Sequence, residues 1–223
     1  GAVNWQTDVN LSMNRNKVLK LGGGITQIFS GEVTSSVTEV GQPIGMFYGY
    51  KFMGIFQNQD EIDKYPHQAG TLPGNVQYED VNGDGQITSA DMTLLGDPTP
   101  RFTWGMTNTV TYEKFDLRVI IDGSQGLKVM DVYKRFADNL DGVFNVEEAL
   151  KNRWRSASDP GNGQYASTTG NTPLAREVNS RWVKNASYMC VRNISLGYTF
   201  REKFVSSARV YVSGQNLRGL NPE

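Results

Sequence analysis

Hydrophobic and polar residues alternate along several stretches of the chain, and this alternation predicts β-strands. From Val3 to Met13 the odd positions are apolar apart from Thr7, and the even positions are polar with little charge. A period of two is the pattern of a strand whose two faces meet different surroundings. The polar face suits a water-filled lumen as well as an exposed surface.

Two further stretches repeat the pattern and add short turns. Alternation over 102–112 continues over 115–121 after only Glu113 and Lys114, which predicts a tight hairpin. Alternation over 188–200 is followed by a polar turn around 201–203 and a strand over 208–216. Aromatic residues flank these short turns, as in outer-membrane barrels, where such rings favour the headgroup layer.

The connections at the opposite strand ends are long. We expect loops over 58–100 and 127–181, which alternate with the short turns. Outer-membrane barrels keep short turns on the periplasmic side and long loops outside the cell, so both loops are expected to be extracellular. A compact soluble domain rarely carries two such loops.

A short helix is expected inside the second loop. Asn145 would cap it with Glu148 as its capping-box partner, and it would run to about Trp154 with a Glu147–Lys151 pair. The Gly- and Ser-rich run over 159–171 that follows predicts flexible loop.

Composition supports an all-β fold and excludes several functions. Hydrophobic residues make up 38% of the 223 residues, with 24 glycines, and the formal net charge is -1 with no long basic run, so nucleic acid is not an expected partner. One cysteine and one histidine exclude an internal disulfide and zinc sites that need several histidines. No run approaches the roughly 20 apolar residues of a transmembrane helix, and Gly1 opens into a strand pattern without a signal peptide.

One motif carries specific chemistry. The segment from Asp80 to Asp91 matches the calcium loop of the EF-hand, with Gly85 at its sharp turn and Ile87 as a buried anchor. The predicted side-chain ligands are Asp80, Asn82, Asp84 and Asp91. Gln86 is expected to bind through its main-chain carbonyl, and Thr88 directly or through water.

This loop departs from the EF-hand pattern in two ways. Asp91 replaces the usual bidentate glutamate, and 75–79 before the loop reads as extended rather than helical. A structural Ca²⁺ ion that rigidifies a long loop is therefore preferred over a calcium switch, with a metal-free turn as the remaining alternative.

The inventory of catalytic residues does not support an enzyme. Cys190 lies in mid-strand with no histidine near it in sequence, and His67 lies in a polar loop segment. The acidic residues Asp60, Glu61 and Asp63 read as solvated loop charge rather than as a glycosidase pair.

Collinear segments resemble the SusC/RagA family of TonB-linked outer-membrane proteins. The segments, in order, are 41–50, 54–57, 80–85, 96–100, 112–117, 187–188, 192–198 and 211–217. They cover nearly the whole chain. The resemblance implies that residues 1–223 form one partial domain from the C-terminal half of a transmembrane β-barrel of ~22 strands in the bacterial outer membrane.

The same resemblance implies function and partners. Family members import glycans or peptides, are energised through TonB by an N-terminal part, and work with a SusD-like lipoprotein that closes over the barrel. The chain would contribute wall strands in contact with lipid and extracellular loops. The alternative is a secreted, soluble, calcium-stabilised β-sandwich that binds carbohydrate and folds as a self-contained monomer.

Overall fold

The computed structural model describes residues 1–138, 145–167, 174–202 and 205–220. The chain divides into two compact units. Unit 1 comprises Gly1–Arg15, Thr99–Lys128 and Asn185–Glu223, and unit 2 comprises Asn16–Pro98 and Val129–Lys184. The segment outside the long-stranded unit therefore begins at Asn16, well before the expected loop start at Asn58.

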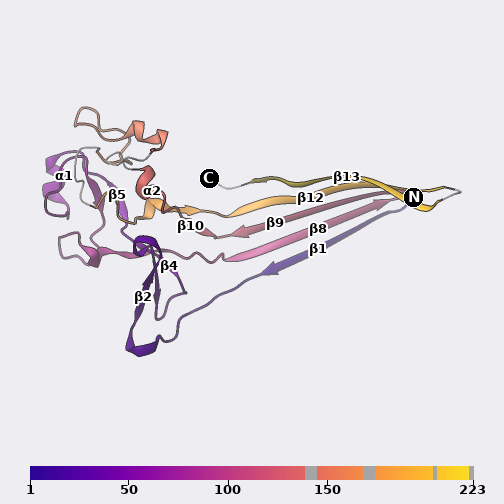
Figure 1. Cartoon of the computed structure of the whole chain (residues 1–223), viewed down its shortest axis with the longest axis horizontal. Coiled ribbons are helices and arrows are strands. Elements are labelled where there is room, and N and C mark those ends of the chain that lie inside the picture. The colour runs from indigo at the N-terminus through magenta and orange to yellow at the C-terminus, as the bar shows by residue number, and fades with distance from the viewer. Residues whose placement is uncertain (139–144, 168–173, 203–204, 221–223) are drawn as a thin grey trace. The chain divides into compact units, whose positions relative to one another are not determined.

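Unit 1 is a five-stranded antiparallel sheet in the order β1-β8-β9-β12-β13 (Figure 1). Its strands are β1 (Val3–Ser12), β8 (Phe102–Tyr112), β9 (Phe115–Gln125), β12 (Tyr188–Glu202) and β13 (Val205–Leu220). The all-β antiparallel prediction is confirmed. The hairpin at Glu113 is confirmed too, since Tyr112 lies opposite Phe115 and Glu113 adopts the left-handed φ of +54° that a two-residue turn requires.

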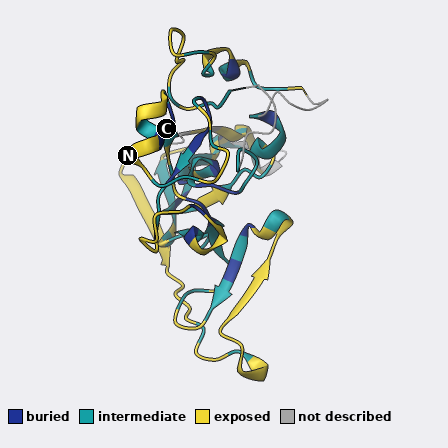
Figure 2. Cartoon of the chain, turned by 90° about the vertical axis from the view of Figure 1, so that its left-hand side faces the viewer, coloured by how far each residue is buried: buried dark blue, intermediate teal, exposed yellow. Residues whose placement is uncertain are grey.

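The register of unit 1 collects apolar side chains on one face of the sheet. Trp5 lies opposite Val110, Val110 opposite Leu117, and Leu117 opposite Leu196. These side chains are not covered: Trp5 is 70% exposed and Leu196 47%. Figure 2 shows the strand that starts at the N-terminus as exposed along its length.

Unit 2 is built from short strands. A four-stranded sheet has the order β2 (Gln27–Ser30), β3 (Ser36–Glu39), β4 (Met46–Gly49) and β7 (Thr93–Gly96). A two-stranded sheet pairs β5 (Phe52–Ile55) with β6 (Val76–Tyr78), so the extended segment expected before the acidic loop is confirmed. A further two-stranded sheet pairs β10 (Lys128–Met130) with β11 (Val183–Asn185), and all but Lys128 and Asn185 of these residues belong to unit 2.

The helices are short. The α-helices are α1 (Gln59–Lys64) and α2 (Lys134–Ala137), and the 3-10 helices are η1 (Gly22–Gly24), η2 (Glu32–Thr34), η3 (Ser89–Asp91), η4 (Glu148–Asn152) and η5 (Ser180–Trp182). Among the described residues, none of these helices has the length and the hydropathy needed to cross a membrane.

The helix expected from Asn145 to Trp154 is corrected in extent and type. It is the 3-10 helix η4, which is preceded by Glu147 without any side-chain cap. Lys151 pairs with Glu148 at 2.7 Å rather than with Glu147, because residues three apart are stacked in a 3-10 helix. Glu147 pairs instead with Lys134 of α2. Part of the expected flexible run over 159–171, and part of the expected turn at 201–203, lie outside the described residues.

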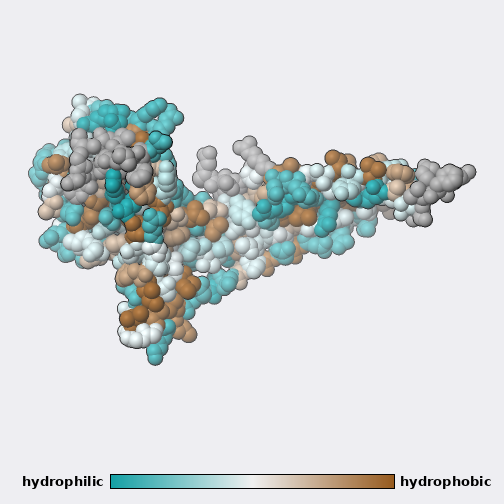
Figure 3. All heavy atoms as spheres, viewed as in Figure 1, coloured by the Kyte–Doolittle hydropathy of each residue, from teal (hydrophilic) through white to brown (hydrophobic). Residues whose placement is uncertain are grey.

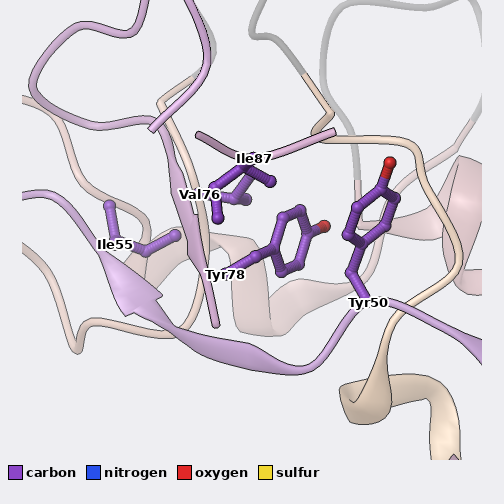
Figure 4. Close-up of a cluster of buried hydrophobic side chains, with 5 residues drawn as sticks. All are labelled: Tyr50, Ile55, Val76, Tyr78 and Ile87. Atoms are coloured by element: carbon purple, nitrogen blue, oxygen red, sulfur yellow. The ribbon is translucent and has the colours of Figure 1, made fainter. Parts of the chain in front are cut away.

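A cluster of buried side chains forms the core of unit 2 around β5 and β6. It comprises Tyr50, Ile55, Val76, Tyr78 and Ile87 (Figure 4). The rings of Tyr50 and Tyr78 stack with centroids 4.8 Å apart. Phe52, Met92, Trp154, Ala166 and Leu174 pack against the cluster from both sequence segments of unit 2. The two segments are thus joined by one apolar core.

Candidate functional site

The acidic loop is held by hydrogen bonds from its own backbone to its carboxylates. Asp80 accepts N–H bonds from Gly83 at 2.6 Å and from Gly85 at 2.8 Å. Gly85 has a φ of +82°, a backbone conformation that is unfavourable for any residue with a side chain. These N–H groups favour the charged carboxylate, so the pKa of Asp80 lies below its ordinary value of 3.8.

The middle of the loop forms a chain of Asx turns. Asn82 accepts a hydrogen bond from the Asp84 N–H at 2.8 Å, and Asp84 accepts one from the Gln86 N–H at 2.9 Å. The Asn82 amide also donates to Asp84 at 3.0 Å. Asn82 and Asp84 are exposed and Asp80 is partly exposed, and hydrogen bonds within the turn hold this part of the loop together.

Asp91, at the end of the loop, is buried. It is 0% exposed and accepts N–H bonds from Val81 at 3.0 Å and from Thr88 at 2.8 Å. The Thr88 hydroxyl accepts the Ala90 N–H and caps η3. Asp91 therefore closes the twelve-residue loop by joining its two ends, and Thr88 acts as a helix cap.

The predicted ligands fit a hard cation that prefers oxygen. Asp80 and Asp84 offer carboxylates and Asn82 an amide oxygen, all of which are hard oxygen ligands. Among the described residues, no three His, Cys, Asp or Glu side chains gather closely enough to bind a metal by themselves. An ion in this loop would therefore depend on Asn82 and on main-chain carbonyls as well.

The loop is anchored in the core of unit 2 as its pattern predicts. Ile87 is 3% exposed and belongs to the cluster with Tyr78, which lies two residues before Asp80. Burial raises the pKa of Tyr50 to about 12 and raises that of Tyr78 further, so both hydroxyls stay protonated. The loop and the stacked tyrosines are consequently one packed unit.

The core also fixes a second segment, 174–182, which sequence reasoning did not identify. Tyr78 donates its hydroxyl hydrogen bond to the Leu174 carbonyl at 3.0 Å. The Tyr50 N–H donates to the Val178 carbonyl at 2.8 Å, and the Ser180 N–H donates to the Tyr50 carbonyl at 2.9 Å. Gly49 is required beside this contact, because a Cβ there would lie 2.4 Å from the Val178 oxygen.

Arg181 ends this segment in a polar groove. Its guanidinium lies 4.5 Å from the ring centroid of Phe52 and 5.5 Å from that of Tyr165. Arg181 Nη2 lies 3.7 Å from Asp138 Oδ2. Burial raises the pKa of Asp138 although Arg181 and Lys134 oppose this effect. Asn179 is the residue from which the sequence could have predicted this turn, because asparagine is a common helix N-cap. Its side chain caps η5 by accepting the Arg181 N–H at 3.1 Å.

The remaining candidates have local structural roles. His67 contacts the Tyr65 carbonyl at 2.9 Å and packs edge-on against Phe56, and the Cys190 thiol lies 3.4 Å from the Leu217 carbonyl. Glu61 accepts the Gln57 N–H at 2.8 Å, and Asp63 accepts the Gln59 amide at 2.7 Å. These acidic groups support α1.

The polar face of unit 1 carries ion pairs between strands. Asp122 of β9 accepts two hydrogen bonds from Arg192 of β12, at 2.7 and 3.0 Å. Asp116 of β9 pairs in the same bidentate way with Arg209 of β13, which reaches it across Gly197 of β12. This face therefore neutralises four of its own charges.

Comparisons with known proteins identify relatives over almost the whole chain. TonB-dependent receptors P3 and P26 of Formosa agariphila are 32% and 31% identical over 96% of this chain, and TonB-dependent receptor SusC of Bacteroides thetaiotaomicron is 25% identical over 98%. The chain spans only 22% of each of these proteins. No protein-family profile matches the chain.

Solved structures agree in fold. The structure of the RagAB peptide transporter matches 99% of this chain with a TM-score of 0.79 at 19% identity, and the RagAB peptide importer in its 'open-open' state matches with a TM-score of 0.76. The chain spans 24% and 23% of those chains. The chain is therefore a homologue of a segment of the TonB-dependent receptors, the family to which SusC belongs.

Proposed function

We propose that the chain is a segment of a TonB-dependent importer in the bacterial outer membrane, where unit 1 forms part of the barrel wall and unit 2 is extracellular. The observation that carries this proposal is the two-faced sheet of unit 1. One face exposes Trp5, Val9 and Val212, between 69% and 70% exposed, and the other carries polar residues and the ion pairs. A barrel wall needs lipid on one face and water on the other.

The distribution of aromatic residues supports the same function. Tyr112, Phe115 and Tyr198 lie at the hairpin end of unit 1, with the rings of Phe115 and Tyr198 4.8 Å apart. Rings of this kind favour the headgroup layer at the rim of an outer-membrane barrel. The short hairpin turn then belongs to the periplasmic side.

The cargo and partners belong to the whole receptor. SusC and the RagAB proteins suggest a glycan or a peptide as cargo, a SusD-like surface lipoprotein as partner and TonB as the energy source, through parts outside this segment. No catalytic step is assigned to the chain. The relatives match 96% of the chain and are receptors, which favours the receptor segment over the secreted sandwich.

A pair of substitutions in the full-length receptor tests the wall. Val9→Lys places a charge on the apolar face near the middle of β1, and Gln6→Lys places the same charge on the polar face of that strand. A lysine on the lipid face costs roughly 2–4 kcal/mol at mid-membrane. We expect Val9→Lys to lower the amount of receptor inserted in the outer membrane and Gln6→Lys to leave it unchanged. Equal tolerance of both would refute the wall assignment.

We propose further that Ca²⁺ binds the loop Asp80–Asp91 as a structural ion. The oxygen-bearing side chains of Asp80, Asn82 and Asp84 and the buried anchor Ile87 support this proposal. An ion there would offset the repulsion between neighbouring carboxylates and hold the loop against the core. Asp80, Asn82, Asp84 and Asp91 would supply the side-chain oxygens, with Gln86 through its carbonyl and Thr88 directly or through water.

Thermal unfolding of the purified receptor in excess Ca²⁺ and in chelator tests the ion. Binding to the folded state alone would stabilise it by about 2.7 kcal/mol at a hundredfold excess over Kd, so the midpoint should rise with Ca²⁺. Asp80→Asn should abolish the rise. Asp60→Asn, an exposed acidic position on α1, should keep it. A wild-type midpoint that is the same with and without Ca²⁺ would favour the metal-free turn.

A further inference from the structure

The outer edge of β2 in unit 2 has the features of a strand that is paired in the intact protein. β2 is the edge strand of its sheet, and all four of its residues, Gln27–Ser30, are exposed. Val40 donates its N–H to the Thr26 carbonyl at 3.0 Å, which fixes the alternation of bonded and non-bonded pairs along β2 and β3. By that alternation, Gln27 and Phe29 direct their N–H and C=O groups away from β3.

These outward groups have no partner among the residues that the structure describes. The hydrogen bonds of the sheet lie on the β3 side of β2, and neither Gln27 nor Phe29 has another. In an isolated edge, two donors and two acceptors would be left to water. Such an edge is a template for a further strand.

Large apolar side chains on and beside β2 in the sequence are exposed. Ile28 is 44% and Phe29 49% exposed, and Ile25, Val40 and Ile44 nearby are 50%, 38% and 60% exposed. Figure 3 shows hydrophobic atoms gathered over the β2 region. Gln27–Ser30 contains no charged residue and no proline, and such residues protect a free edge from aggregation. An unprotected edge indicates a permanent cover.

We infer that an extended segment of the same receptor chain, outside these 223 residues, pairs with the outer edge of β2. This inference rests on the proposed function. The chain spans 22% of its curated relatives, so most of such a receptor is available to supply the strand. A segment of the same chain has a high effective concentration and covers the edge from folding onward, whereas a transient cargo would leave it open between transport events.

Photo-crosslinking in the full-length receptor, expressed with its partner lipoprotein in the outer membrane, tests the occupant. A photoreactive residue is introduced at Gln27, and the same residue at Gln59 of α1 serves as an exposed control away from any strand edge. We expect the probe at Gln27 to give a cross-link within its own polypeptide, mapped by mass spectrometry beyond the present segment. A cross-link to the lipoprotein, to a second receptor or to a peptide, or a yield no greater than the control, would overturn the inference.

Amide hydrogen exchange in the same receptor gives an independent readout. The Gln27 and Phe29 amides should exchange as slowly as those of Ile28 and Ser30, slower than open amides by on the order of a hundredfold. Fast exchange at Gln27 and Phe29 alone would show an open edge and overturn the inference. A receptor that never reaches the outer membrane would instead refute the proposed function, so the two failures are distinguishable.

Discussion

Gly197 shows at the residue scale why a glycine can be required without an unusual backbone angle. A Cβ at this position would lie 2.5 Å from Asp116 Oδ1 and from Arg209 Nη2, so the ion pair can cross β12 only over a glycine. We expect Gly197→Ala to lower the thermal midpoint of the receptor more than Gly214→Ala, where the added Cβ meets only the movable tip of Leu217 at 3.2 Å.

The ion pair itself is largely exposed and screened by solvent, so most of the loss should come from the clash. In an Asp116→Asn background the cost of Gly197→Ala should shrink, because a side chain no longer held by Arg209 can yield. Additive losses in this double-mutant cycle would show that the pair and the glycine are independent.

Asp80 makes a pH prediction at the same scale. Its pKa is lowered in the folded loop, so its N–H hydrogen bonds contribute stability that is complete above its ordinary pKa of 3.8 and is lost as the pH falls through the lowered value. In chelator, the difference in thermal midpoint between wild type and Asp80→Asn should be constant from neutral pH to about pH 5 and disappear only in stronger acid. A difference that declines between pH 7 and pH 5 would contradict the lowered pKa.

At the scale of elements, one buried hydroxyl helps to hold the segment 174–182 in place. Tyr78→Phe removes the donor to the Leu174 carbonyl and the acceptor of the Asn179 amide, which should cost about 0.5–1.5 kcal/mol locally. We expect faster proteolysis within 174–182 of the folded receptor. Tyr65→Phe, at a 43% exposed tyrosine, should not change the cleavage rate. Equal rates in both variants would mean that packing alone holds the segment.

At the scale of the whole molecule, the exposed faces predict how the isolated chain behaves. The sheet of unit 1 has β1 and β13 at its edges and an uncovered apolar face, so the 223 residues alone should self-associate without detergent. Light scattering and sedimentation should show oligomers that detergent reduces. A monodisperse monomer with cooperative unfolding in plain buffer would contradict the barrel assignment.

The sequence by itself determined the strands of unit 1, the hairpin at Glu113 and the anchor Ile87, because period-two alternation, turn residues and a twelve-residue loop motif are local. It also carried the resemblance to SusC. The 3-10 form of η4 was not predicted, because Glu147 forms an ion pair with Lys134, thirteen residues earlier, and not with Lys151.

Only the tertiary structure decided which distant residues meet. It paired β1 with β8 across some ninety residues of intervening chain, placed Arg181 against Phe52, and set Arg209 over Gly197. A local sequence pattern does not predict contacts between distant residues, because these contacts depend on strand order and on which side chains the core of unit 2 can bury. For the same reason the open edge of β2 became visible only once β3 had been placed beside it.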